Sequence, residues 1–474
     1  MGVTDELIRL TATEAVARLR RREISPLELI DAAAARMDAV ESKVNALPIR
    51  FIDAARESAR RFMAKKPPQD PPPGWLAGLP MAAKDYNDVA GQRTTFGSPI
   101  FADSVAPAND HTVATLEASG AIFMAKSNVP EFAGSNTFNP VFGATRNPWQ
   151  LKMTAGGSSG GAAAALASGT QWLAMGSDLG GSLRIPASYC SIVGLRPSVG
   201  RAPRGAGLPA FDSLWVEGPL ARNVPDLALM LDALSLQHPR DPLSFPAPRV
   251  PFTTAVQQPR PPRRVAFTPN LGLSNVDPEV AAICRAAARR FTDLGTSVEE
   301  ASPDFSNAID TFQTQRGLLF AALRGDLVAT ERARINPSIV WNIEKGLNLT
   351  ADEIIRAERE RTSLYHRVAA FFDQFDLLVC PTVAVPPYPV EQPYPTQIGD
   401  QKLTSYIDWM FLTFVVTLTG CPALSLPCGF TRDGLPIGLQ IVGPSHGDAE
   451  VIAAASLLER KLGIAPRLPI DPVP

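Results

Sequence analysis

Two Gly-Gly-Ser triplets, Gly156-Gly157-Ser158 and Gly180-Gly181-Ser182, lie on either side of an alanine-rich run near the middle of the chain. Glycine lets a backbone approach another group closely and take up φ/ψ values that other residues avoid. A serine that follows two glycines therefore keeps its hydroxyl and the neighbouring N–H groups uncovered. The pattern indicates either two parts of one site or two tight turns that flank a helix.

Helix and strand signals alternate along most of the chain, a pattern typical of α/β proteins. Near the N-terminus, apolar residues recur at helical spacing, and Thr11 with Glu14 makes a capping box. We expect a single α/β domain over residues 1–474. Its parts are an N-terminal helical layer at 12–63, a core with both triplets at 78–235, a proline-rich connection at 239–262, and the remainder of the α/β core at 263–462.

A β-α-β unit is predicted in the second half of the chain. Residues 264–268 are strand-like, and Asp277 with Pro278 is a suitable N-cap and first position for a helix. Gly295 would end that helix, and 296–299 would return as a strand. This order favours two parallel neighbouring strands joined by the helix.

Turn and breaker residues predict two further connections. The stretch 239–262 holds eight prolines, which are expected to exclude regular structure there. The apolar stretches 423–427 and 435–442 lie on either side of Asp433-Gly434, a pair typical of a hairpin turn.

Composition excludes several classes of function. The net charge is −2 and no long run of Lys or Arg occurs, so neither nucleic acid nor an anionic membrane is an expected partner. The five cysteines form no C-x-x-C pair and the four histidines are isolated, so we expect no metal, no cofactor and a reduced, cytoplasmic setting. Neither a signal peptide nor an apolar run long enough for a membrane span is recognisable.

The triplets are compatible with two other kinds of chemistry. Phosphate binding is weakly supported, because neither triplet is followed by Lys-Ser/Thr or completes G-x-G-x-x-G after a clear strand. Residues 156–160 also match the G-x-S-x-G elbow of α/β-hydrolase esterases, with Ser158 as nucleophile and His446 downstream. An elbow needs a buried strand directly before it, and Pro148 and Lys152 interrupt that stretch.

The run GGSSGG, followed by SDLGGSLRIPASYCSIVGLRPSVGR, resembles the amidase signature family of serine hydrolases. The resemblance extends from about residue 25 to about residue 460, and a set of ordered motifs is far more specific than one motif alone. It implies a mixed β-sheet between helical layers and an amide hydrolase that needs no cofactor. The other similar blocks are GLPMAAKDYNDVAG at 78–91, FGATRNPW at 142–149, GPLARNVPDLALMLDAL at 218–234 and GLPIGLQIVGP at 434–444.

The resemblance implies a Ser-Ser-Lys triad, with Ser182 as nucleophile, Ser158 as the bridging serine and Lys84 as base. A serine hydroxyl is a weak nucleophile until a base takes its proton. Lysine can do so near neutral pH only if burial lowers its pKa. Lys84 follows the apolar run 81–83, which is compatible with a buried position.

Further site residues follow from the same resemblance. The family has a cis peptide bond before the bridging serine, which would lie at Gly157-Ser158. Asp178 and Arg184 flank the nucleophile loop, and we expect an ion pair between them to brace it. The backbone N–H groups expected to form an oxyanion hole belong to Leu179, Gly180 and Gly181, together with that of Ser182.

Two departures bear on the alternative that the chain is a subunit of a tRNA-dependent amidotransferase. Ile185 stands where those subunits usually carry glutamine, and Thr417 where a late motif often has asparagine. Both changes favour a stand-alone hydrolase acting on a small-molecule amide or carbamate, such as an aryl or alkyl amide or a derivative of a nitrogen-rich heterocycle. By resemblance, residues 132–138 and 406–411 would form pocket walls. The oligomeric state stays open, with a homodimer as one alternative.

Overall fold

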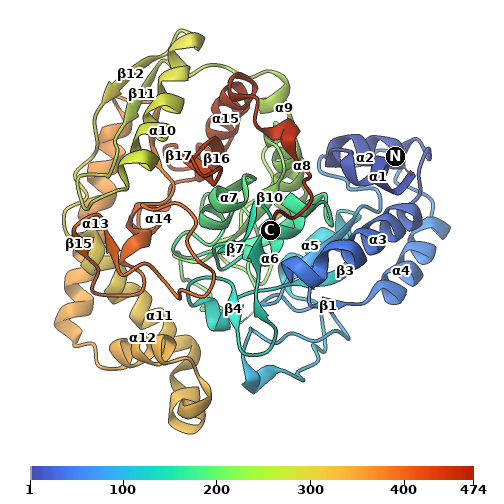
Figure 1. Ribbon diagram of the computed structural model, residues 1–474, viewed down its shortest axis with the longest axis horizontal. Helices are drawn as coiled ribbons and strands as arrows, with labels where there is room; N and C mark the ends of the chain where they lie inside the picture. The colour runs from blue at the N-terminus through green and yellow to red at the C-terminus, as the bar shows by residue number, and fades with distance from the viewer. Residues whose placement is uncertain (1–2, 206) are drawn as a thin grey trace.

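An 11-stranded mixed sheet runs through the computed structural model, which describes residues 3–205 and 207–474 (Figure 1). Helices flank this sheet, as the resemblance implied. In spatial order the strands are β1 (Ile49–Arg50), β3 (Ile122–Ser127), β2 (Pro80–Lys84), β8 (Leu173–Asp178), β10 (Val216–Ala221), β9 (Val193–Arg196), β16 (Ala423–Phe430), β17 (Pro436–Val442), β13 (Leu377–Pro381), β11 (Arg264–Phe267) and β12 (Ser297–Glu300).

Strand direction changes along the sheet. β2 is parallel to both β3 and β8, and β11 is parallel to both β12 and β13. The strands between these groups pair antiparallel, including the predicted hairpin of β16 and β17. The predicted β-α-β unit is also confirmed, with α10 (Pro278–Arg289) between β11 and β12 and Gly295 ending the short 3₁₀ turn that follows the helix.

The N-terminal layer predicted at 12–63 consists mainly of helices, and a short helix, α1 (Val3–Arg9), precedes it (Figure 1). The capping box at Thr11 and Glu14 is present. Ser25 caps the next helix in the same way, ahead of Pro26. The remaining helices are α1 (Val3–Arg9), α2 (Ala12–Arg20), α3 (Pro26–Val44), α4 (Ile52–Ala64), α5 (His111–Ala118), α6 (Gly160–Ser168), α7 (Arg184–Cys190), α8 (Val224–Leu234), α9 (Phe252–Gln257), α11 (Ala308–Glu331), α12 (Pro337–Leu347), α13 (Ala351–Phe372), α14 (Phe411–Thr417) and α15 (Asp448–Leu462).

The expectation of no regular structure at 239–262 is wrong, because α9 lies within it. The helix occupies the proline-free stretch after Pro251. The Asp232 carboxylate accepts hydrogen bonds from the backbone N–H groups of Phe252 at 2.6 Å and Thr253 at 3.1 Å, and so caps the first turn from outside the helix. Phe252 is also buried in the core, which anchors the short helix.

Two apolar clusters build the core, and the second Gly-Gly-Ser segment lies between them. Leu183 and Ala187 belong to the larger cluster, which fills the space around the N-terminal helices and the strands. Leu179, Ile185 and Tyr189 belong to the other, which continues into α11, α12 and α14. This segment therefore contacts both clusters. No helix among the described residues is long and apolar enough to cross a membrane.

Candidate active site

Lys84 ends strand β2 and is fully buried (0 % exposed). Its Nζ donates hydrogen bonds to the hydroxyls of Ser158 at 2.8 Å, Ser159 at 2.8 Å and Ser177 at 2.9 Å. Ser177 is the next-to-last residue of β8, which runs parallel to β2. Parallel neighbouring strands end at the same edge of a sheet, and this brings Lys84 and Ser177 together.

Ser158 and Ser159 lie in the turn that leads into α6. The peptide bond between Gly157 and Ser158 is cis, as the resemblance implied. Only glycine fits at 157, since a Cβ there would lie 2.1 Å from the carbonyl oxygen of Ser135. Ser158 is 1 % exposed, so both it and Lys84 are enclosed by protein.

Ser182 lies in the turn between β8 and α7 and remains partly exposed, unlike the two buried groups above. The Ser159 N–H donates a hydrogen bond to the Ser182 carbonyl at 3.2 Å, which joins the two serine-bearing turns. Within the described residues, no hydrogen bond links the hydroxyls of Ser158 and Ser182. In proteins without bound substrate, catalytic hydrogen bonds are often long and tighten only on binding.

The electrostatic setting of Lys84 favours its neutral form. Burial lowers the pKa of Lys84 to about 7, and the carboxylates of Glu217 and Asp178 oppose that shift. Glu217, on β10, is itself 2 % exposed and accepts a hydrogen bond from Trp215 Nε1 at 3.0 Å. Burial raises the pKa of this carboxyl. A lysine of this kind can accept a proton near neutral pH, which an ordinary surface lysine cannot do.

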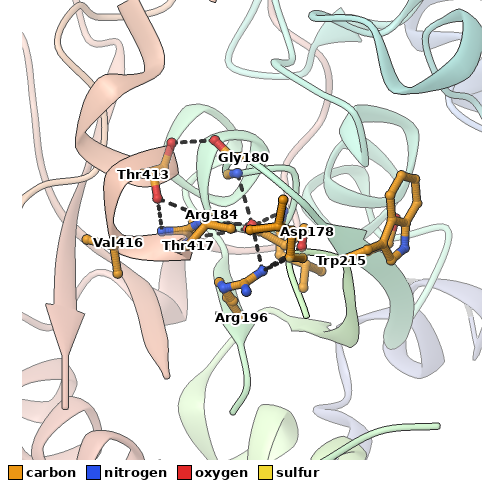
Figure 2. Close-up of polar contacts among 12 residues, drawn as sticks. Asp178, Gly180, Arg184, Arg196, Trp215, Thr413, Val416 and Thr417 are labelled. Atoms are coloured by element: carbon orange, nitrogen blue, oxygen red, sulfur yellow. Dashed lines mark hydrogen bonds and ion pairs between the residues drawn. The ribbon is translucent and has the colours of Figure 1, made fainter. Parts of the chain in front are cut away.

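The predicted ion pair between Asp178 and Arg184 is present and fully buried (Figure 2). Arg184 donates from Nη2 to Asp178 Oδ1 at 2.8 Å and from Nε to Oδ2 at 3.0 Å. Arg196 adds a second guanidinium 3.6 Å from the same carboxylate. Burial alone would raise the pKa of Asp178, but Arg184 and then Arg196 lower it to about 2.

Helix α14 holds the turn that carries Ser182 from the other side (Figure 2). Thr413 Oγ1 donates to the Gly180 carbonyl at 2.7 Å, and its own carbonyl accepts from Arg184 Nη1 at 2.9 Å. Thr417 Oγ1 accepts from Arg184 Nη2 at 3.1 Å. Arg184 thus joins the strand that carries Asp178 to the helix that carries both threonines.

The expected oxyanion-hole donors differ in their availability. The Gly181 N–H already donates to Asp178 Oδ1 at 2.9 Å, contrary to the expectation that it is open. The Gly180 N–H has no hydrogen-bond partner among the described residues, and Gly180 is partly exposed beside Ser182. A Cβ on Gly181, which has a φ of 124°, would lie 2.4 Å from Thr413 Oγ1, so the turn needs glycine there.

A cavity of about 410 Å³ lies near Lys84, although Lys84, Ser158 and Ser182 are not among the residues that line it. The ring of Tyr86 lies 4.9 Å from Lys84 Nζ and lines this cavity, as do Phe132 and Glu217. The expected pocket wall at 132–138 is only partly realised, because Phe132 is the one residue of this stretch that lines the cavity. Residues 406–411 are not among those that line the cavity, and their Trp409 is buried in the second apolar cluster.

The alternative chemistries gain little support from the geometry. The strand before Ser158, β7 (Gln150–Thr154), pairs with β6 (Arg146–Asn147) in a small separate hairpin, so Ser158 is not at the end of a central strand. His446 packs with its ring 5.4 Å from that of Phe245. In the described part of the chain, no group of three or more His, Cys, Asp and Glu side chains could hold a metal ion.

Sequence reasoning missed three residues that contact the site. Ser177 begins the run that resembles the family and Glu217 directly precedes the similar block at 218–234. Neither position indicates by itself that the two residues face each other on adjacent strands, close enough to Lys84 to act on it. Arg196 lies on β9 and reaches Asp178 across the sheet. A charged residue within an otherwise apolar strand was the one available signal for Glu217 and Arg196, since such residues are rarely buried without a partner.

Several known proteins resemble this chain over nearly its full length. The family model described as Amidase matches residues 28–452. The acylamidase of Rhodococcus erythropolis is 35 % identical, with 98 % of this chain and 97 % of that protein covered. The glutamyl-tRNA(Gln) amidotransferase subunit of Moorella thermoacetica is 34 % identical, with 96 % and 97 % covered. The crystal structure of a bacterial aryl acylamidase of the amidase signature family is similar at a TM-score of 0.88 and 30 % identity, with 97 % and 99 % covered.

Proposed function

The chain belongs to the amidase family and is an amide C–N hydrolase, and we propose that Ser182, Ser158 and Lys84 carry out its reaction. In this proposal Ser182 is the nucleophile, Ser158 relays protons and Lys84 is the base. The observation that carries it is the buried Nζ atom of Lys84, which contacts three serine hydroxyls and has no carboxylate within ion-pair distance among the described residues.

Acylation begins when neutral Lys84 takes the proton of the Ser158 hydroxyl while Ser158 takes that of Ser182. The Ser182 Oγ then forms a bond to the carbonyl carbon of the substrate, and the carbonyl oxygen becomes negatively charged. The N–H groups of Leu179 and Gly180 donate to this oxyanion, and each such donor contributes about 3 kcal/mol to lowering a barrier of this type. The tetrahedral intermediate collapses as the C–N bond breaks, and Ser158 passes a proton to the departing nitrogen.

Deacylation repeats these steps with water. Water gives a proton through Ser158 to Lys84 as its oxygen attacks the acyl carbon. The bond from Ser182 to the acyl group then breaks, Ser182 recovers its proton, and the carboxylic acid leaves. In each half of the cycle, Lys84 gives back through Ser158 the proton that it accepted, so no other acid or base is required.

We propose aryl or alkyl amides and carbamates as the substrates. The cavity beside Lys84 supports this class, because the aromatic side chains of Tyr86, Phe96, Phe132 and Trp215 contribute to its wall. Large planar groups pack well against such walls. The similar structure of an aryl acylamidase is compatible with this assignment.

A role within an amidotransferase assembly remains the second candidate, favoured by the similarity to the Moorella protein. We propose instead that the chain acts without a partner, in the cytoplasm, and a homodimer is compatible with this. The cysteines support a reduced compartment, since all five are free and buried.

An assay of the purified chain tests both points. We expect hydrolysis of an aryl amide by the chain alone, with loss of that activity in Ser182→Ala, while size-exclusion chromatography gives the mass of the active species. Hydrolysis only in the presence of added partner proteins would favour the amidotransferase role.

A further inference from the structure

The cavity near Lys84 contains a cation that makes no ion pair among the described residues. Arg324, on α11, lines this cavity. Its guanidinium carbon lies 5.2 Å from the centre of the Phe96 ring and 5.0 Å from that of Phe132. Among the described residues its side chain makes one hydrogen bond, from Nη1 to the Leu323 carbonyl at 3.1 Å, and no ion pair.

The two aromatic contacts leave the N–H donors of this guanidinium free to bind another group. A guanidinium has five N–H donors in its plane, arranged to hold the two oxygens of a carboxylate. One of these donors is used by Leu323. Burial lowers the pKa of Arg324, and the Tyr86 hydroxyl is the one group that opposes the shift. A partly buried cation with unpaired donors beside a cavity is therefore placed to receive an anion from a ligand.

Two of the three carboxylates that line the same cavity accept hydrogen bonds from other groups. Asp110 accepts from the Thr112 N–H at 2.7 Å, and Glu217 accepts from Trp215 Nε1 at 3.0 Å. Neither lies within ion-pair distance of Arg324 in the described residues. The other charged or titratable side chains that line the cavity are Asp88, His111 and Arg240.

We propose that this cavity selects amide substrates that carry a carboxylate, which Arg324 binds against the aromatic wall of Phe96 and Phe132. The inference rests on the proposed function, since it names the substrate class of the same site. Tyr86 lines the cavity and its ring lies 4.9 Å from Lys84 Nζ, so the cavity borders the proposed base. A substrate bound at Arg324 must therefore be long enough to extend past Tyr86 to Ser182. A volume of about 410 Å³ accommodates an aromatic acyl group with its carboxylate.

The test compares three benzanilides that differ only at the para position of the benzoyl ring, which bears a carboxylate, a carbamoyl group or an amino group. The carbamoyl compound has nearly the shape of the carboxylate without its charge. We expect kcat/KM for the carboxylate to exceed that for the carbamoyl compound by about tenfold, mainly through KM, as is usual for one charge-assisted hydrogen-bonded contact.

The variant Arg324→Gln removes the charge and should reduce this ratio to about one, while Arg324→Lys should retain part of it because a single ammonium cannot bind both oxygens. Arg356→Gln is the matched control, since Arg356 is exposed on α13, and it should leave the ratio unchanged. A wild-type ratio near one, a ratio that Arg324→Gln leaves unchanged, or a preference for the amino compound would overturn the inference.

A second measurement separates this inference from the proposed function. The affinity of Ser182→Ala for the carboxylated and the carbamoyl benzanilides can be measured by calorimetry, without turnover. Tighter binding of the carboxylate that is lost in Ser182→Ala/Arg324→Gln supports the inference even if no benzanilide is hydrolysed. Equal affinity for both compounds contradicts it even if hydrolysis by Ser182 is established.

Discussion

Glu217 lies directly opposite Ser177 in the antiparallel pair of β10 and β8, and Ser177 Oγ is one of the three hydroxyls that bind Lys84. Opposite residues in such a pair share one face of the sheet. The buried carboxyl of Glu217 therefore lies on the same face of the sheet as the Ser177 hydroxyl that binds Lys84. Its charge raises the pKa of Lys84 against the effect of burial.

Glu217→Gln should therefore move the pH dependence of hydrolysis. Without the carboxylate, the pKa of Lys84 falls further below its ordinary value, because only Asp178 still opposes the desolvation. The midpoint of the rising limb of kcat/KM should shift to lower pH, and a pH profile on a neutral aryl amide measures it. Glu299→Gln, an exposed change on β12, serves as control. A midpoint that stays in place would show that Glu217 is protonated where Lys84 titrates, and a midpoint that rises would contradict the effect of its charge on Lys84.

Lys84 itself should define that limb. Burial lowers the pKa of Lys84 to about 7, so the rate should rise with pH to a midpoint near there and stay high in mildly alkaline solution. Lys84→Ala should remove the limb and reduce kcat at least a hundredfold, which corresponds to about 2.7 kcal/mol. Lys84→Arg should fail as well, because a guanidinium keeps its proton. If Lys84→Ala retained more than about a tenth of kcat, lysine would not be the base.

Gly181→Ala should inactivate the enzyme through the shape of the nucleophile turn. A Cβ at this position would lie 2.4 Å from Thr413 Oγ1 and 2.8 Å from Ile185 Cδ1, so either the turn or α14 must shift. We expect a loss of kcat of at least about a hundredfold, because a displacement of about 1 Å has that effect on a positioned nucleophile. Gly434→Ala is the matched control, since its φ of 78° is also positive but a Cβ there meets open space. Equal losses in both variants would refute the steric explanation.

Asp178→Asn should destabilise the fold. The change leaves the buried guanidiniums of Arg184 and Arg196 without their carboxylate, and breaking a buried pair in this way costs about 3–5 kcal/mol. Urea denaturation followed by circular dichroism measures the free energy of unfolding. Glu299→Gln, which removes an exposed ion pair with Arg264, should change it little. A loss no larger than in this control would mean that the ion pair does not brace the turn.

The lowered pKa of Asp178 also predicts that the stability of the fold depends on pH. The pKa of Asp178 in the folded chain is about 2, below its ordinary value of 3.8. Its contribution to stability is therefore fully present above about pH 4 and disappears as the pH falls towards 2. The difference in unfolding free energy between the wild type and Asp178→Asn should narrow over that window.

Local signals predicted the parts of the site that lie close together in the sequence. The paired glycines indicated turns because glycine takes φ/ψ values that other residues avoid, and the structure shows that a Cβ would clash at Gly157 and Gly181. The apolar run before Lys84 was compatible with the buried strand end that is observed. The ion pair of Asp178 and Arg184 spans one turn, so a short-range argument sufficed for it.

Contacts between distant segments were beyond that reasoning. The placement of Glu217 beside Lys84 depends on the register of β10 against β8, and that of Thr413 beside Gly180 on how α14 packs against the second apolar cluster. Helix α9 was missed because its first turn is capped by Asp232, which precedes the proline-rich stretch. Arg324 lies on a helix with no recognisable motif, and only the cavity gives it a role.

In the proposed mechanism Ser182, and not Ser158, becomes acylated. Ser182 is the partly exposed serine, beside the Gly180 N–H, whereas Ser158 is buried against Lys84. Reaction of the wild-type enzyme with a fluorophosphonate, followed by peptide mass spectrometry, locates the nucleophile directly. We predict a single adduct on Ser182 that is absent from Ser182→Ala and forms more slowly in Lys84→Ala. An adduct on Ser158 would contradict the account and support an elbow-type hydrolase instead.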